Sequence, residues 1–159
     1  MNADAPQLLP VEPGYKNVLR VRMGVFGLVF AGLAFVADRL LLAPAGYGGL
    51  LAGFASLLAI ALVVVAPQRA YRHLRYGVGE RLLQVVRGWL FHTDTVVPLV
   101  RVQHLDVVRG PFDKMFGTAS LVVHTAGTHN SVVTVPGLAP GRAAEMRDII
   151  REHVSADAA

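Results

Sequence analysis

The chain has no cysteine, which excludes a disulfide framework and thiolate metal sites. It is also poor in charge: only 16% of its 159 residues are charged, whereas 53% are apolar. Both values depart from the averages of soluble proteins in the direction that membrane segments produce. The net charge is +4 and the pI is about 10.0. Because the basic residues flank apolar runs, this charge favours a membrane surface over nucleic acid.

Charge is absent altogether from residues 46–66, an apolar run that Pro67 follows. At about 1.5 Å per residue, a helix of this length crosses the roughly 30 Å hydrocarbon core of a bilayer. A second apolar stretch, residues 23–43, is interrupted only by Asp38 and Arg39. We therefore predict a hairpin of two transmembrane helices over 23–43 and 46–66, joined by a short turn rich in glycine.

Two features of the predicted hairpin leave alternatives open. Asp38 and Arg39 fit a helix end at the headgroups, where Arg39 extends to the lipid surface and Asp38 pairs with it; an intramembrane relay is the alternative. The spacings Gly27-x-x-x-Ala31 and Gly49-x-x-x-Gly53 let helices approach closely. They predict packing within the hairpin, with homo-oligomerisation as the alternative.

The distribution of basic residues orients the hairpin. Only Arg39 lies near the turn, whereas six basic residues flank the outer ends of the two helices: Lys16, Arg20, Arg22, Arg69, Arg72 and Arg75. The positive-inside rule therefore predicts a multi-pass protein of the cytoplasmic membrane with both termini in the cytoplasm. Residues 1–22 begin with prolines and small residues, and we expect a flexible cytoplasmic tail there.

After Gln68 the pattern changes, because valines come in short runs separated by turn signals. Runs of this kind, dominated by β-branched residues, are typical of short strands. Six such runs follow one another: residues 73–78, 81–88, 89–99, 100–110, 118–127 and 131–137. Pro98 lies inside one of them and predicts an edge, a bend or a break at that point.

The last segment has the pattern of one amphipathic helix. Pro140 suits the first turn of a helix, and an apolar stripe recurs after it at spacings of three and four: Ala143, Met146, Ile150 and Val154. This stripe must cover another element. The natural partner is an open end of the strand series, since a barrel capped in this way protects its exposed edge. We predict an α+β protein: a two-helix transmembrane hairpin, then an antiparallel β-barrel with a C-terminal capping helix over residues 68–155.

Several short motifs in the strand region match a known family. Arg87-Gly88 precedes Trp89, the segment 95–99 leads to 101–104, and Gly110-Pro111-Phe112 leads to Phe116-Gly117. Over roughly residues 70–153 the chain resembles the bacterial pleckstrin-homology (PH) domain that is flanked by membrane helices, known as bacterial PH type 2 or DUF304. The hairpin is similar to that of the short membrane members of this group.

The resemblance implies a PH-like barrel at the cytoplasmic face of the bacterial inner membrane, without an assigned enzymatic activity. It also implies a membrane protein partner, because short members often accompany longer relatives with repeated PH-like domains. The chain itself carries one copy and no internal repeat.

Residues that could carry out chemistry are scattered. Of the six histidines, His124 and His129 flank a predicted turn and could approach each other, but a zinc site needs three or four ligands, and we expect no acid between or beside them. Asp94, Asp106 and Asp113 are single carboxylates, and no pair suggests acid–base catalysis. We therefore expect no enzyme, no cofactor and no metal. Residues 68–159 contain 11 Lys and Arg against 8 Asp and Glu, and no basic helix that would indicate nucleic-acid binding.

Two groups of residues remain as candidate contact sites. The first is basic and lies near the membrane: Arg69, Arg72, Arg75 and Lys114. Each cation near an anionic leaflet contributes roughly 1 kcal/mol, although the positive-inside pattern alone also explains the arginines. The second is an apolar turn with helical spacing: Phe112, Met115 and Phe116. It either plugs the barrel or forms an exposed contact for a partner or the membrane. We expect a membrane-anchored module that binds other proteins, with anionic-lipid binding as the alternative.

Overall fold

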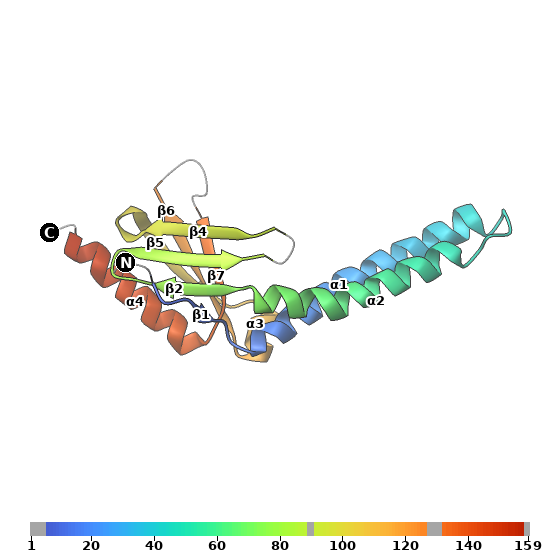
Figure 1. The fold of residues 1–159 in the computed structure, drawn as a ribbon. Helices are drawn as coiled ribbons and strands as arrows, with labels where there is room; N and C mark the ends of the chain where they lie inside the picture. Colours follow the sequence, from blue (N-terminus) through green and yellow to red (C-terminus); the bar gives the residue numbers. More distant parts are fainter. Residues whose placement is uncertain (1–5, 89–90, 127–131, 158–159) are drawn as a thin grey trace. The chain divides into compact units, whose positions relative to one another are not determined.

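The structure is a computed structural model that describes residues 6–88, 91–126 and 132–157. The chain divides into two compact units. One unit, here called the hairpin unit, contains residues 16–69, and the other, the sheet unit, combines residues 1–15 with residues 70–159. Figure 1 shows the two helices of the hairpin unit and the strands of the sheet unit.

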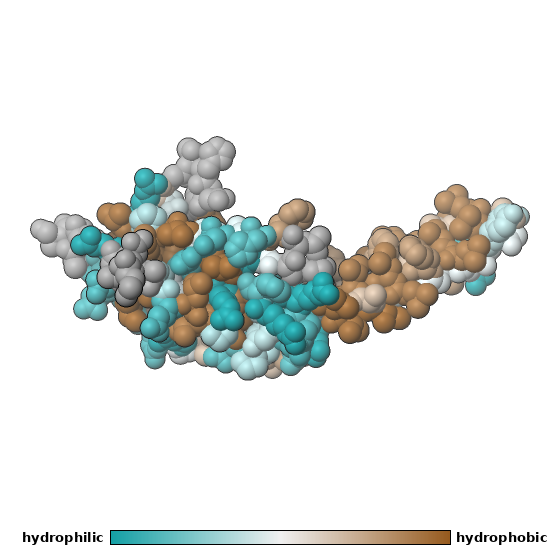
Figure 2. All heavy atoms as spheres, in the orientation of Figure 1, coloured by the Kyte–Doolittle hydropathy of each residue, from teal (hydrophilic) through white to brown (hydrophobic). Residues whose placement is uncertain are grey.

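The hairpin unit contains the two apolar helices that the sequence predicts. Helix α1 (Gly14–Ala37) continues into a π-helical turn, η1 (Asp38–Leu42), and α2 (Leu50–Arg72) returns. Both are long and apolar enough to cross a membrane, and their surface is hydrophobic along most of its length (Figure 2). The helices differ in extent from the predicted spans 23–43 and 46–66. Both helices continue into the polar residues that flank the apolar runs, because a change in hydropathy marks the edge of a membrane span but does not terminate a helix. Pro67, which follows the predicted second span, lies inside α2.

The two helices approach each other through small residues. A Cβ atom on Gly27 would lie 3.2 Å from a methyl group of Val63 and 3.5 Å from the Cβ of Ala59. Ala55 and Ala59 are buried one helical turn apart on α2. The spacing at Gly27 therefore packs within the hairpin, as predicted. The second predicted spacing does not, since a Cβ on Gly53 would meet nothing within 4 Å among the described residues.

Asp38 closes the hairpin instead of pairing with Arg39. Its side chain is buried, with 1% exposed, and it accepts hydrogen bonds from the backbone N–H groups of Gly49 at 2.7 Å and Leu51 at 3.1 Å. These donors belong to the start of α2, where amides have no partner within the helix. Arg39 stacks on the ring of Phe35, with 5.1 Å to the ring centroid. The expected Asp38–Arg39 pair is therefore replaced by a helix cap.

The sheet unit contains all six predicted strands. They are β2 (Arg75–Val78), β3 (Leu82–Arg87), β4 (Thr93–Pro98), β5 (Val102–Val108), β6 (Ala119–Thr125) and β7 (Val132–Leu138). A 3-10 turn, η2 (Leu99–Arg101), separates β4 from β5, and a short helix, α3 (Pro111–Phe116), separates β5 from β6. Of the edge, bend or break expected at Pro98, the structure has a break, because β4 ends there.

The strands form two antiparallel sheets, ordered β1-β2-β3-β4 and β5-β6-β7. The predicted α+β class is confirmed, but among the described residues the sheets do not close into a barrel, since β4 and β5 are not paired. The physical reason is the turn after Pro98, which redirects the chain between them. Arg87 bridges the sheets by donating from Nη2 to the Thr134 carbonyl at 2.7 Å.

We expected a flexible tail over residues 1–22, but residues 9–22, which the structure describes, include a strand and the start of a helix. Leu9 and Pro10 form β1, which pairs with β2 (Figure 1). Val11 is buried, with 3% exposed, and the N–H of Glu12 donates to the Gly137 carbonyl at 2.8 Å. The tail therefore supplies a strand and a core side chain to the sheet unit, and α1 starts at Gly14.

One hydrophobic core lies between the two sheets and the last helix, α4 (Pro140–Asp157). The predicted stripe on α4 is confirmed, because Ala143, Met146 and Ile150 are buried and Val154 packs against the core. The helix covers β5, β6 and η2. The inward faces of β3, β6 and β7 supply most of the fully buried strand residues.

Candidate functional site

The end of the sheet unit from which both helices emerge is the first candidate site. Pro10 of β1 pairs with Arg75 of β2, and the hydroxyl of Tyr71, near the end of α2, donates to the Val11 carbonyl at 3.3 Å. The chain segments that lead into α1 and out of α2 are thus joined side by side. Leu74, between α2 and β2, is buried in the core.

Helix α3 packs at this same end. A Cβ on Gly14 would collide with the carbonyl oxygen of Phe116, so only glycine allows the close approach of α1's first residue to α3. The helix ends at Phe116, and Gly117 caps it with a φ of 67° that suits glycine. Asp113 holds the loop, because its carboxylate accepts from the Gly110 N–H at 3.1 Å and the hydroxyl of buried Thr118 at 2.7 Å.

The side chains of α3 do not plug the sheets, which corrects one of the two alternatives above. Met115 is 71% exposed, Lys114 is exposed, and Phe112 and Phe116 are half-buried. None of the three apolar residues belongs to the buried core. The reason is that α4 already covers the core, so that α3 is left as a surface turn with an apolar tip.

The basic residues predicted to face lipid are all exposed: Arg69, Arg72, Arg75 and Lys114. Arg69 and Arg72 lie three positions apart at the end of α2, and therefore on one face of it. Arg75 is the first residue of β2. Lys114 lies on α3, and α3 and the start of β2 share one end of the sheet unit.

The edge of β5 is a second candidate site. Among the described strands, β5 pairs only with β6, which leaves its other edge open. A groove of about 300 Å³ runs between residues 102–105 of β5 and the side chains of Arg147, Arg151 and Val154 on α4. A strand edge with unpaired backbone groups is a template for an added strand. The two arginines make this groove basic, although Arg147 also pairs with Asp148 at 2.8 Å.

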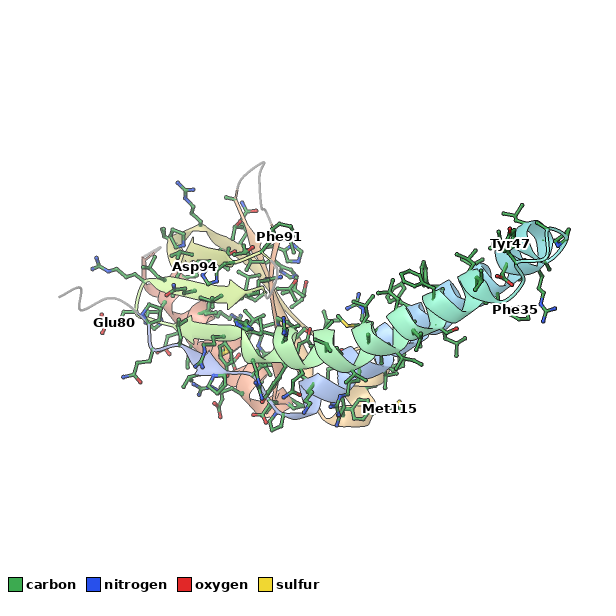
Figure 3. The ribbon with its side chains drawn as sticks, turned by 45° about the vertical axis from the view of Figure 1, so that its right-hand side comes forward. Phe35, Tyr47, Glu80, Phe91, Asp94 and Met115 are labelled. Atoms are coloured by element: carbon green, nitrogen blue, oxygen red, sulfur yellow. The ribbon has the colours of Figure 1, made fainter. Side chains whose placement is uncertain are left out.

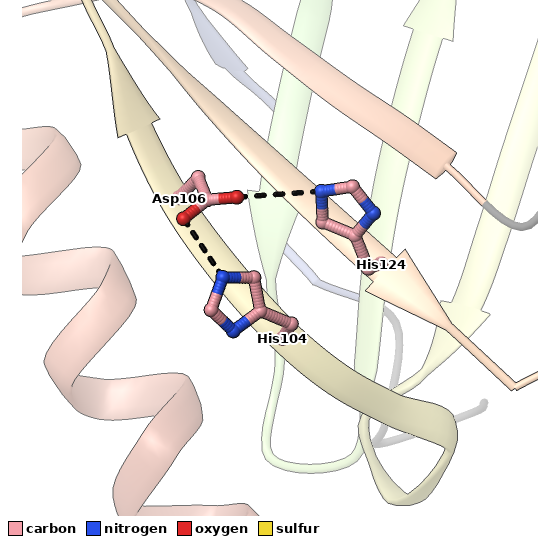
Figure 4. Close-up of polar contacts among 3 residues, drawn as sticks. All are labelled: His104, Asp106 and His124. Carbon is pink, nitrogen blue, oxygen red and sulfur yellow. Dashed lines mark ion pairs between the residues drawn. The ribbon is translucent and has the colours of Figure 1, made fainter.

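A third group lies on the outward face of β5 and β6 (Figure 4). His104 and His124 are cross-strand neighbours, and the carboxylate of Asp106 lies between them. Nε2 of His104 is 2.9 Å from Oδ1 of Asp106, and Nε2 of His124 is 3.4 Å from Oδ2. The expectation that no acid lies beside His124 is therefore wrong, because the strand pairing brings Asp106 to it. His129, its expected neighbour, lies outside the described residues.

This group has the geometry of a surface ion pair. The side chains are between 39% and 68% exposed, and each histidine approaches the Asp106 carboxylate with its Nε2 atom. In residues 6–88, 91–126 and 132–157, no three His, Cys, Asp or Glu side chains are arranged to hold a metal ion. Exposed pairs of this kind contribute about 0–1 kcal/mol to stability.

Another charged pair lies near the first turn of α4. Arg142 donates from Nη1 to Oε2 of Glu145 at 3.1 Å, and this hydrogen bond raises the pKa of the Arg142 guanidinium above its ordinary value. The side chain stays cationic at any physiological pH. It lines a groove of about 650 Å³ between α4 and strands β1 and β2.

The combination of a membrane hairpin, two antiparallel sheets and a covering helix agrees with the comparison against known families. A family model of the bacterial PH domain matches residues 25–154. The chain belongs to the bacterial PH domain family. The match takes in most of both units of this bacterial PH protein and begins after β1.

A curated relative supports the membrane assignment. The UPF0699 transmembrane protein YdbS of Bacillus subtilis (strain 168) is 33% identical over 107 residues, which are 67% of this chain and 65% of the relative. The match thus spans just under two thirds of the relative's length. No solved structure matches the chain. With its two long apolar helices, this bacterial PH protein is a membrane-associated protein with a PH-like sheet unit.

Sequence reasoning missed two parts of these sites. The groove beside β5 depends on which strand lies at the sheet edge, and the sequence does not give strand order. The Asp106 cluster depends on the register that places His124 opposite His104. The available signal in the sequence was that His104, Asp106 and Val108 are two residues apart, which places them on the same face of one strand.

Proposed function

We propose that this protein is a non-enzymatic, membrane-anchored PH-like module that binds another protein at the cytoplasmic face of the bacterial inner membrane. The observation that carries the proposal is the open edge of β5 beside the basic groove on α4. A partner segment that adds to this edge gains backbone hydrogen bonds, and acidic side chains on it would face Arg147 and Arg151. Anchoring raises the effective concentration of the module toward other membrane proteins.

The orientation within the membrane rests on two independent arguments. Basic residues flank the outer ends of the helices, and only Arg39 lies at the turn. In addition, residues before and after the hairpin belong to one sheet unit, which supports the proposal that both ends of the hairpin lie on the same side of the bilayer. Together they support a multi-pass protein with cytoplasmic termini, and a membrane protein as partner. A longer relative with repeated PH-like domains fits this role.

The test is native mass spectrometry of the full-length protein, gently extracted from its own membrane, compared with the double variant R147E/R151E. We expect a stoichiometric second polypeptide with the unchanged protein and its loss with the variant. The matched control is R81E, which reverses an exposed arginine that does not line the groove. A partner that both variants retain, or no partner at all, would contradict binding at β5.

A second candidate function is the binding of anionic lipid through Arg69, Arg72, Arg75 and Lys114. The observation that favours it is the exposure of all four side chains. Tightly held anionic lipid on a lone chain in the same mass spectra would support this function. Neutralising the four charges should then remove the lipid, and the effect should weaken at high salt because the attraction is screened.

A further inference from the structure

Two exposed apolar side chains lie at the end of the sheet unit that joins the membrane helices. Met115 on α3 is 71% exposed, and Phe91, in the turn between β3 and β4, is 81% exposed. An exposed side chain of this size gains free energy when it moves from water into an apolar environment. Figure 3 shows both toward one end of the sheet unit and Glu80 at the other.

The position of Met115 follows from contacts inside the sheet unit. Gly14 is the first residue of α1, and it touches the backbone of Phe116 so closely that a Cβ atom would collide there. The ring of Tyr15 packs against the backbone of Gly137, which has a φ of 72°. A Cβ atom added to Gly137 would lie 2.6 Å from this ring. Helix α3 is therefore held beside the residue at which the first membrane helix begins.

The position of Phe91 follows from strand register. Arg75, which enters β2 directly after α2, pairs with Val86 of β3. The strand ends at Arg87, so that the turn carrying Phe91 lies next to the point where the second membrane helix ends. Two separate loops thus present an apolar side chain where the helices leave the sheet unit.

If the hairpin spans the bilayer, the length of its first helix brings Gly14 close to the lipid surface. The helix from Gly14 to Leu42 has 29 residues and is about 43 Å long at 1.5 Å per residue. A bilayer including its headgroup regions is roughly 40–45 Å thick. If the turn near Arg39 lies at the far headgroups, Gly14 lies at the near ones, and α3 lies beside it.

We propose that Met115 and Phe91 insert into the headgroup region of the leaflet that carries the hairpin, with Lys114 beside the lipid phosphates. The apolar tips then exchange water for the acyl boundary, and the cation next to Met115 complements anionic lipid. Two such contacts, added to the two helices, hold the sheet unit in one orientation. This contact does not rest on the proposed protein partner and leaves the β5 edge available to one.

The test uses the absence of cysteine from the chain. Full-length M115C, F91C and V100C are labelled with a nitroxide and reconstituted in vesicles of phosphatidylethanolamine and phosphatidylglycerol. Collisions with oxygen, which concentrates in lipid, are compared with collisions with a water-soluble nickel chelate. Val100 is the matched control, because it is 69% exposed and follows β4 at the opposite end, about 20 Å away along the six residues of β3.

Labels at 115 and 91 should lose most of their nickel collisions and gain oxygen collisions relative to the label at 100. The proposal is overturned if either label resembles that at position 100. It is also overturned if the labels are shielded from both reagents, since burial against a second copy or another protein would produce that result. K114Q should make the label at 115 shallower in these vesicles, and an unchanged depth would overturn the role of Lys114.

Discussion

At the scale of single residues, three aspartates accept hydrogen bonds or form ion pairs in environments that differ in burial. Asp38 is buried and accepts two backbone hydrogen bonds, Asp113 accepts two more across the α3 loop, and Asp106 is about half exposed between two histidines. Buried donors left without an acceptor cost more than a surface pair contributes. We therefore expect the loss of stability on removing a carboxylate to be larger for the more buried aspartates, Asp38 and Asp113, than for Asp106.

Replacing Asp38 with alanine should loosen the turn of the hairpin. The variant leaves the amides of Gly49 and Leu51 without an acceptor, and loss of a helix cap costs about 0.5–2 kcal/mol. Hydrogen exchange of the peptide containing these amides, measured on the full-length protein in detergent, should accelerate by roughly two- to thirtyfold. D38N should lose less, because its amide oxygen still accepts. R39Q is the control and should leave exchange unchanged; equal exchange in D38A would refute the cap.

Two glycines should respond in opposite directions to alanine. G137A places a Cβ 2.6–2.9 Å from the ring of Tyr15 at a φ of 72°, and overpacking of this kind costs about 1–3 kcal/mol. G141A, in the first turn of α4, meets nothing within 4 Å and should stabilise by about 0.4–1 kcal/mol through the unfolded chain. Thermal unfolding of the purified protein measures both. Equal melting temperatures would contradict the packing of Tyr15.

At the scale of elements, α3 depends on its cap more than on its apolar tip. The helix has six residues, too few to be stable without tertiary contacts. It is bounded by Gly110 and Gly117 and tied to Thr118 through Asp113. These contacts fix the position of α3 without involving the side chain of Met115. Substituting Met115 should therefore leave the fold intact.

Comparing D113A with D106A tests this dependence. D113A removes the acceptor of the Thr118 hydroxyl, which is fully buried, and should cost about 1–3 kcal/mol. D106A removes exposed pairs and should cost less than about 1 kcal/mol. Chemical denaturation of the sheet unit within the full-length protein gives both values. A larger loss in D106A would mean that the histidine cluster, and not the α3 loop, holds this part of the sheet.

The elements also show how far the sequence leads. Apolar length predicts both membrane helices, and β-branched runs predict β2 to β7, because these signals are local. Strand β1 escapes prediction because it is two residues long and contains Pro10. The acceptor role of Asp38 escapes as well, since its donors lie 11 and 13 residues away. The candidate site is also only partly predictable. The exposure of Met115 could not be predicted from the sequence, because it depends on α4 filling the core in the folded protein.

At the scale of the whole molecule, the sheet unit is assembled from both sides of the hairpin. Residues 1–15 and 70–159 form one body, although the hairpin separates them in the sequence. The two connections lie side by side, as the hydrogen bond from Tyr71 to Val11 records. If the hairpin spans the bilayer as proposed, it leaves the membrane on the side at which it entered.

Single-cysteine labelling tests this topology. The sequence contains no cysteine, so no native cysteine has to be removed first. A cysteine replacing Asp4 or Ala158 should react with a membrane-impermeant maleimide in inverted membrane vesicles and not in intact spheroplasts. Y47C, in the turn between the helices, should react in the opposite manner. Asp4 and Ala158 labelled from opposite sides would contradict the arrangement, since β1 and β2 could not then pair.

The split sheet unit has a consequence for biogenesis. During synthesis, Leu9 and Pro10 leave the ribosome before either membrane helix, whereas their partner β2 follows both. If the hairpin spans the membrane as proposed, the core residue Val11 meets its neighbours only after both helices have been inserted. A chain with only one helix inserted would keep β1 on the wrong side of the bilayer, with an incomplete core. On the proposed topology, the sheet can be completed only in chains whose two helices have both been inserted.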